Sequence, residues 1–494
     1  MSAPESLDEH IGGSGLQARG ATVAGLQQAM SAGSVTSAEV TSFYLGRIGR
    51  LNPDLHAVIT VSPDAVAEAR ASDGVRAIGR PRGPLEGIPV LVKDNIATRG
   101  MPATAGSPAL LGAASADAFL VGRLREAGAV IVGKANLSEW ANFRSPHSTS
   151  GWSTLGGQTV NPHGKGRNPS GSSSGSAAAL AAALAPLAIG SETDGSVLSP
   201  SGACGVVGLK PTMGLVSRSG IVPISAAQDT AGPMACCVAD VAALLGVMAG
   251  PDPADPATAQ QAGQVPDYTP FLDTGALDGA RLGIWRDGSA EARPAAISVL
   301  DASITRLRER GAEVIDPVHL PDADKISAPE HTALLHEFKH DIDAYLGALG
   351  GDHPASLAEL ITFNTQHRSQ VLLHFGQEWF EQAAAKSGSP ADPEWLAARG
   401  EARRLACAAL DSAVSRDQLD AVVALTGNPA WLTDHVLGDC RVFGTSSPCA
   451  VSGYPAISVP AGRVSGLPVG LTFMGPAWSE PRLIALAYAF EQAG

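Results

Sequence analysis

The 494-residue chain is poor in charge, in cysteine and in aromatic side chains. Only 17% of its residues are charged and 5% are aromatic, while 45% are hydrophobic. Globular domains average roughly 25% charged residues, so this chain has little spare charge to keep a coil in solution. Its six cysteines are too few for a disulfide scaffold, and no Cys-x-x-Cys pair indicates a zinc or redox site. We therefore expect a globular protein with a large core and free thiols.

Targeting signals, long apolar runs and excess positive charge are also missing. The N-terminus has no basic start followed by an apolar run, as a secretory signal would. The longest apolar stretch, Ala177–Ile189, is too short to span a bilayer and contains Pro186. The net charge of −14 disfavours binding to a phosphate backbone. These absences predict a cytoplasmic protein with no nucleic-acid and no membrane partner.

Short apolar runs alternate with helical patterns along most of the chain. Gly87–Lys93 and Ala129–Gly133 are typical of buried strands, whereas Asp117–Ala127 and Pro294–Arg310 have helical spacing. Residues 326–411 follow the pattern of amphipathic helices. This alternation predicts an α/β fold, with one large α/β/α domain in which helices flank a mixed central sheet.

The chain shows no short-period repeat and no clear break in composition. We therefore expect a mobile leader over residues 1–20 and a single domain over residues 21–494. Within that domain, residues 145–176 are crowded with small polar residues and proline and lack periodicity. A long polar segment inside a compact domain is usually functional.

Two clusters of small polar residues bracket an alanine-rich helical segment. They are Ser170–Ser176 and Ser191–Ser196, and a helix followed by a strand can return both clusters to one end of a sheet. A serine hydroxyl is a weak nucleophile until a base removes its proton. Glycine in the turn that ends at Ser196 lets backbone N–H groups approach a substrate oxygen. The segment therefore predicts a site for nucleophilic catalysis by serine.

No histidine stands out in the sequence as the base for such a serine. Only seven of the 34 basic residues are lysines, and Lys93 directly follows the apolar run Ile88–Val92. An apolar setting lowers the pKa of a lysine, and the neutral amine can act as a general base. Lys134 and Lys210 also follow apolar runs and are alternative bases.

At these residues the sequence resembles the amidase signature family. The resemblance extends over about residues 21–492, with a core segment at about 151–235, and is closest to the bacterial peptide amidases. The stretches that carry it are Gly151–Pro162, Gly171–Ala177, Glu192–Ser196, Gly205–Thr212, Gln228–Met234 and Gly466–Pro481.

The resemblance implies a catalytic triad in which Ser196 is the nucleophile, Ser172 is a bridging serine after a cis peptide bond, and Lys93 is the base. Ser173 would support the triad. The implied oxyanion hole consists of the backbone N–H groups of Thr193, Asp194, Gly195 and Ser196. The implied reaction is hydrolysis of a neutral carboxamide through an acyl-enzyme, without metal or cofactor.

The residues around the triad bear on the substrate. Ser174 stands where many family members have glycine, and Leu198 stands where many have arginine. Arginine would pair with a substrate carboxylate, so Leu198 favours neutral or apolar substrates. Trp431 and Phe338 are candidate pocket walls. By resemblance, the partner is a small-molecule or short-peptide amide, with ammonia released from the C-terminal amide of a peptide or amino acid, and the enzyme is a monomer or homodimer.

Several alternatives remain open at this point. The same triad serves aryl-acylamide, anilide or carbamate hydrolases, and an amidase-like chain can also be a non-catalytic binding subunit. Gly171–Gly175 matches the Gly-x-Ser-x-Gly pattern with Ser173 at its centre, but no strand precedes it. His336–His340 matches the His-Glu-x-x-His pattern of zinc proteases, without an identifiable third ligand.

Overall fold

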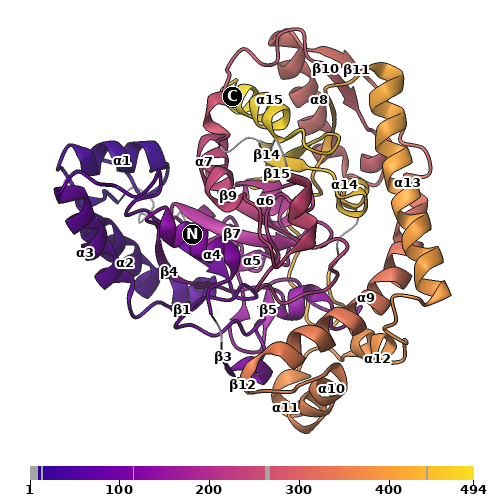
Figure 1. The fold of residues 1–494 in the computed structure, drawn as a ribbon. Coiled ribbons are helices and arrows are strands. Elements are labelled where there is room, and N and C mark those ends of the chain that lie inside the picture. The colour runs from indigo at the N-terminus through magenta and orange to yellow at the C-terminus, as the bar shows by residue number, and fades with distance from the viewer. Residues whose placement is uncertain (1–8, 13–14, 115, 262–266, 441–442, 494) are drawn as a thin grey trace.

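The computed structural model describes residues 9–12, 15–114, 116–261, 267–440 and 443–493. Within them, an 11-stranded mixed sheet runs through the molecule and is flanked by helices (Figure 1), which confirms the expected α/β fold. In spatial order its strands are β1 (Val58–Val61), β4 (Val130–Ala135), β2 (Pro89–Lys93), β7 (Leu187–Glu192), β9 (Thr230–Ala235), β8 (Val207–Lys210), β14 (Ala456–Val464), β15 (Leu467–Met474), β13 (Ala421–Leu425), β10 (Arg281–Ile284) and β11 (Glu313–Ile315).

The helices cover both sides of this sheet and build a separate group at the lower end of the view in Figure 1, around α9 to α12. Among the described residues, no helix combines the length and apolar character needed to cross a membrane. The helices are α1 (Val23–Ser31), α2 (Ser37–Leu55), α3 (Ala65–Ala77), α4 (Phe119–Glu126), α5 (Ser174–Ala181), α6 (Leu198–Cys204), α7 (Val238–Met248), α8 (Pro294–Glu309), α9 (Ser327–Ala348), α10 (Leu357–Gln366), α11 (Arg368–Val371), α12 (Glu378–Ala384), α13 (Pro393–Asp417), α14 (Ser447–Ser452) and α15 (Glu480–Glu491).

The predicted polar segment over residues 145–176 forms little regular structure. It contains only the short hairpin of β5 (Trp152–Ser153) and β6 (Gly157–Gln158) before α5 begins. A second small sheet joins β3 (Gly112–Ala114) to β12 (Gly350–Asp352) and so attaches the α9–α12 region to the N-terminal half of the chain.

Strand direction decides where the polar clusters lie. Strands β2 and β7 are parallel neighbours, with Val92 opposite Ile189. Because parallel strands end at the same edge of a sheet, the ends of β2 and β7 bring Lys93 and Ser191 close together there. Helix α5 precedes β7, so the segment that leads into α5 returns to this edge as well.

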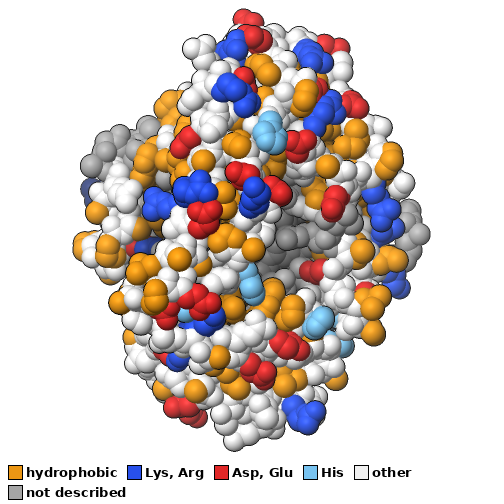
Figure 2. Space-filling model, turned by 90° about the vertical axis from the view of Figure 1, so that its right-hand side faces the viewer, with side chains coloured by type: hydrophobic (Ala, Val, Ile, Leu, Met, Phe, Trp, Pro, Cys, Tyr) orange, Lys and Arg blue, Asp and Glu red, His pale blue; other side chains and the backbone are white. Residues whose placement is uncertain are grey.

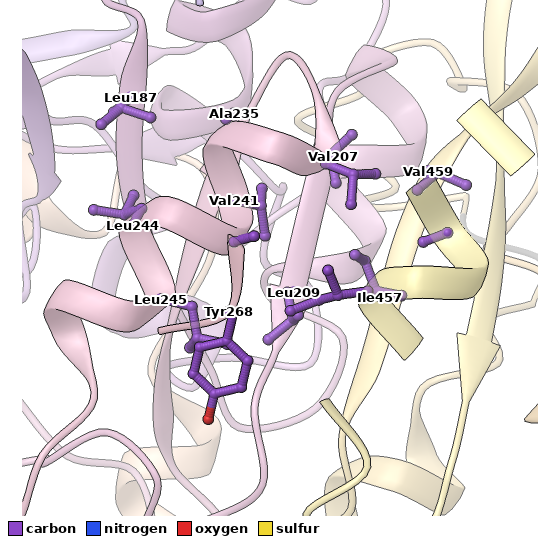
Figure 3. Close-up of a cluster of buried hydrophobic side chains, with 14 of the residues drawn as sticks. Leu187, Val207, Leu209, Ala235, Val241, Leu244, Leu245, Tyr268, Ile457 and Val459 are labelled. Atoms are coloured by element: carbon purple, nitrogen blue, oxygen red, sulfur yellow. The ribbon is translucent and has the colours of Figure 1, made fainter. Parts of the chain in front are cut away.

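Helix α7 is apolar around most of its surface and belongs to the main hydrophobic core. Figure 3 shows Val241, Leu244 and Leu245 of α7 packed over the sheet, near Leu209 of β8 and Ile457 of β14. All five side chains are fully buried. Burial of apolar surface contributes roughly 25 cal/mol per Å², so this contact fixes α7 firmly on the sheet.

The expected leader over residues 1–20 is only partly described, since residues 1–8 and 13–14 lie outside the described residues. Ile11 is fully buried in the main core. Glu9 pairs with Arg47 of α2 at 3.2 Å. This part of the segment is therefore packed against the domain.

Close backbone packing holds the start of α5. The N–H of Gly175 donates to the carbonyl of Asn136 at 2.9 Å. A Cβ at this position would lie 2.3 Å from the carbonyl oxygen of Ala57 and 2.5 Å from the backbone of Asn136. Backbone atoms cannot move aside cheaply, so we expect Gly175→Ala to lower the free energy of unfolding by about 2 kcal/mol or more.

Urea denaturation measures this effect, with Gly74→Ala in α3 as the matched control. A Cβ at Gly74 meets no atom within 4 Å. Alanine there is expected to raise the free energy of unfolding by about 0.5–1 kcal/mol, because it restricts the unfolded chain and favours the helix. Equal unfolding midpoints for the two variants would contradict the packing argument.

Candidate active site

Lys93 is fully buried at the end of β2, among polar groups from the second serine cluster. Its Nζ donates to Ser172 Oγ at 2.8 Å, to Ser191 Oγ at 2.9 Å and to the Ser191 carbonyl at 3.1 Å. Burial lowers the pKa of Lys93 to about 7, against the opposing charges of Glu192 and Asp229. A large fraction of this amine is therefore neutral near pH 7.

Ser172 follows a cis peptide bond from Gly171, as the family resemblance implies. Its side chain is buried, and its carbonyl accepts a hydrogen bond from the Ser138 N–H at 3.1 Å. Ser172 and Ser196 line the same cavity, which has a volume of about 450 Å³. The two serine clusters thus meet at one site, as the order of helix and strand predicts.

Ser173 ties the two clusters together. Its N–H donates to the Ser196 carbonyl at 3.1 Å. Its Oγ donates to the Ser191 carbonyl at 3.1 Å and accepts from the Ser191 N–H at 3.2 Å. Ser173 is fully buried and does not line the cavity. It therefore links the backbone of Ser196 to that of Ser191, whose carbonyl also accepts from Lys93.

The turn between β7 and α6 carries Ser196. Gly195 adopts a φ of 79°, which glycine reaches without strain. The carboxylate of Glu192 accepts the N–H groups of Val197 at 2.7 Å and Leu198 at 3.0 Å. Within the described residues, the N–H groups of 193–196 make no hydrogen bond, so the turn has donors available for a substrate oxygen.

The cavity walls come from segments that are far apart in sequence. The face on which α9 and α13 lie, at the right of Figure 1, is hollowed near its centre (Figure 2). Beyond the two serine clusters, the described lining residues are Ala141, Asn142, Phe143, Ser145, Pro146, Ser148, Ser150, Ile224, Ser327, Glu330, His331, Leu334, Trp379, Leu437, Asp439 and Ser447. Sequence reasoning missed the acidic residues Glu330 and Asp439, because no motif marks either one.

Two predicted pocket residues do not reach this cavity. Phe338 is 1% exposed and stacks on Phe380 with ring centroids 5.1 Å apart. It lies one helical turn beyond Leu334 on α9, where Phe143 separates it from the cavity. Leu198, also 1% exposed, packs in a hydrophobic cluster of the core and does not line the cavity.

Trp431, the third predicted wall, lines a much smaller neighbouring pocket. That pocket also contains Ser170 and Phe443. Since Ser170 lines the main cavity as well, Trp431 lies close to the site without forming its wall.

The alternative lysines do not contact the serines. Lys134 Nζ donates to the Ile96 carbonyl and lies 3.9 Å from Asp94 Oδ1. Lys210 Nζ donates to the Pro211 carbonyl at 2.9 Å. Among the lysines of the described chain, Lys93 is the one with a hydrogen bond to a serine hydroxyl.

The His-Glu-x-x-His pattern does not bring its two histidines to a common point. His336 contacts Glu394 at 2.9 Å, whereas His340 contacts the Gly388 carbonyl at 3.1 Å. The described side chains close enough to share a metal ion are His336, Asp392 and Glu394. Glu394 already forms an ion pair with Lys386, with 2.8 Å between Nζ and Oε2. These groups are distinct from the cavity that holds Ser196.

Comparison with known proteins agrees with the resemblance that the sequence carries. The amidase family model matches residues 39–484. A probable amidase of Arabidopsis thaliana is 42% identical over 485 residues, covering 96% of this chain and 90% of the relative. The crystal structure of the native peptide amidase of Stenotrophomonas maltophilia is 50% identical, with a TM-score of 0.91 and 96% of each chain covered.

A structure of a peptide amidase in complex with the competitive inhibitor chymostatin is 51% identical to this chain. Its TM-score is 0.93, and the alignment covers 96% of this chain and 97% of that one. This chain therefore matches the peptide amidase structures in both fold and sequence over nearly its whole length. The chain belongs to the amidase signature family and is an amidase, a hydrolase that acts on amides.

Proposed function

We propose that this amidase cleaves neutral carboxamides with Ser196, Ser172 and Lys93 as a catalytic triad, and that its substrates are C-terminal amides of peptides or amino acids. The observation that carries the proposal is the contact between the buried Lys93 amine and Ser172 Oγ at 2.8 Å, in a cavity shared with Ser196. An amine with a pKa of about 7 is matched to proton transfer near neutral pH.

The hydrogen bonds of Lys93 support its role as the base. A neutral amine has two N–H groups and one lone pair. Ser191 supplies two acceptors, its Oγ and its carbonyl, for the two N–H groups. The lone pair then remains for the hydroxyl proton of Ser172.

In the proposed reaction, Lys93 takes the proton of Ser172 while Ser172 takes that of Ser196. The Ser196 oxygen attacks the amide carbon, and the N–H groups of the 193–196 turn stabilise the oxyanion. The relay returns the proton to the leaving nitrogen, and ammonia departs. Water attacks the resulting ester by the same relay and releases the carboxylic acid.

The cavity supports a neutral amide as substrate. Of the described residues that line it, none is a lysine or an arginine, so a free carboxylate finds no cationic partner there. A peptide with a C-terminal amide lacks the charge that such a site would repel. The similar peptide amidases, 50% and 51% identical, support the same substrate class.

Ammonia and amine release from a panel of peptide amides, aryl anilides and carbamates tests the proposal. We expect ammonia from the peptide amides and none when Ser196→Ala is used as the blank. Release from anilides or carbamates alone would be consistent with the proposed triad but would contradict the proposed substrate class. Release of nothing, together with no labelling of Ser196 by a serine-directed probe, would contradict the catalytic proposal.

A further inference from the structure

The cavity beside Ser196 is strongly one-sided in charge. Among its described lining residues, three carry carboxyl groups: Asp194, Glu330 and Asp439. No described lining residue is a lysine or an arginine. His331 also lines the cavity, but burial lowers its pKa, so its ring is neutral at pH 7. The described part of the wall therefore offers hydrogen-bond acceptors and negative charge, and it contains no lysine or arginine.

Glu330, at the start of α9, has a carboxyl oxygen without a partner. The side chain is 5% exposed, and its Oε1 accepts a hydrogen bond from Gln228 Nε2 at 2.5 Å. Its Oε2 makes no hydrogen bond to the described residues and is not one of the fully enclosed atoms, so it is open to the cavity. A charged donor on a bound ligand could reach this oxygen, and a hydrogen bond between charged groups is stronger than one between neutral groups.

The position of Glu330 is tied to the nucleophile turn. Gln228, which holds its Oε1, also donates to the Thr193 carbonyl at 2.9 Å. The carbonyl oxygen of the same Gln228 amide accepts from Arg399 at 2.9 Å. The carboxyl group is thus fixed relative to the turn that carries Ser196.

Asp194 faces the same space. Its two carboxylate oxygens accept hydrogen bonds from the hydroxyl groups of Ser446 at 2.5 Å and Ser447 at 2.6 Å. Burial, and then the negative charge of Asp194, raise the pKa of Glu330 to about 8. A cation placed between the two groups would favour ionised Glu330 and be attracted by both.

The Arg399 guanidinium, whose charge acts on Glu330, does not supply that cation. Arg399 Nε donates to Glu337 Oε1 at 2.7 Å, and another of its nitrogens pairs with Glu337 Oε2. Arg399 is therefore shared between Glu337 and Gln228, outside the cavity lining.

We propose that Glu330 and Asp194 form a subsite for a protonated amine in the acyl part of the substrate. The enzyme then favours amides of amino acids and short peptides that carry an ammonium group close to the scissile bond. This inference rests on the proposed function and narrows its substrate class.

Two matched pairs of amides test the subsite. The first is leucinamide with a free amino group against its N-acetyl form. The second is N-acetyl-alanyl-lysinamide against N-acetyl-alanyl-norleucinamide, which differ only in the side-chain ammonium. For at least one pair we expect wild-type kcat/KM to be about tenfold higher for the charged member, as expected for one charged hydrogen bond.

The Glu330→Gln variant removes the carboxyl group that a bound cation would hold ionised, and it keeps the shape of the side chain. We expect it to bring the ratio within about twofold, mainly by lowering kcat/KM for the charged member. Glu126→Gln is the control, because Glu126 is exposed on α4 and does not line the cavity, yet the same carboxyl-to-amide change is made there. That control is expected to keep the wild-type ratio.

The outcomes separate this inference from the proposed function. Equal kcat/KM within both pairs, or a preference that survives in Glu330→Gln, would overturn the subsite while ammonia release would still uphold the peptide-amide substrate. No ammonia from any of the four amides would overturn both. A loss of the preference in Glu126→Gln as well would assign it to overall charge and overturn the subsite.

Discussion

Replacing Ser196 by alanine is expected to lower kcat by about 10⁵-fold, because the proposed nucleophile is lost and no other activated nucleophile replaces it. The change should leave the fold intact. The Ser196 side chain lines the cavity, and the structural contact at this position is the hydrogen bond from the Ser173 N–H to the backbone carbonyl of Ser196. Steady-state ammonia release from a peptide amide, compared with thermal unfolding of the same preparation, measures both effects.

Ser199→Ala provides a matched control for this variant. Ser199 lies one turn along on α6, in the neighbouring small pocket, and its side chain does not line the main cavity. We expect kcat within about threefold of wild type, as for a substitution that touches no reacting group. Substantial turnover in Ser196→Ala, or equal losses in both variants, would contradict the role of Ser196.

Replacing Lys93 by methionine is expected to lower kcat/KM by about 10⁴-fold or more, because no base remains for Ser172. Methionine fills much of the same buried volume without a charge. The two Ser191 acceptors lose a partner, so some loss of stability accompanies the loss of activity. Near-wild-type activity in a folded Lys93→Met variant would refute the assignment of the base.

The pH profile follows from the same residue. The active form of Lys93 is the neutral amine, and its pKa is lowered to about 7. We therefore expect kcat/KM to rise as pH increases through about 7 and to level off above it, with about a tenth of the plateau value at pH 6. A profile that falls over this range would require a protonated catalytic group instead.

Lys134→Met distinguishes a structural lysine from a catalytic one. Lys134 is fully buried and lies 3.9 Å from the equally buried Asp94, without contact to a serine hydroxyl. Removing one partner of a buried ion pair typically costs about 3–5 kcal/mol of stability. We expect a lower unfolding midpoint in urea but retained kcat in the folded enzyme, opposite to the result for Lys93→Met.

Much of the candidate site follows from local sequence. The apolar run that ends at Lys93 predicts a buried strand and a desolvated amine, and the structure contains both. The glycine of the 193–196 turn predicts a close approach of backbone N–H groups to a substrate oxygen, and in the structure Gly195 adopts a positive φ, which glycine reaches without strain. These features depend on backbone conformations and hydrophobic periods that act over a few neighbouring residues, so they can be derived without the fold.

The cavity wall could not be derived in this way. Glu330, Phe338 and Leu334 share one face of α9, yet Glu330 and Leu334 line the cavity while Phe338 is covered by Phe143 and Phe380. Helical periodicity predicts which residues share a face. It does not predict which turn of that face meets another element, since this depends on where the helix ends are held.

Residue types and short-range patterns are enough to predict the α/β class and the residues that can carry serine chemistry. Tertiary structure alone decided that Ser172 and Ser196 share a cavity with Glu330 and Asp439. It also decided that Lys93, and not Lys134 or Lys210, contacts the serines. These contacts arise because β2 pairs with β7 and α9 packs against the loops. Both arrangements bring together residues that are tens to hundreds of positions apart in sequence, and no local pattern encodes such contacts.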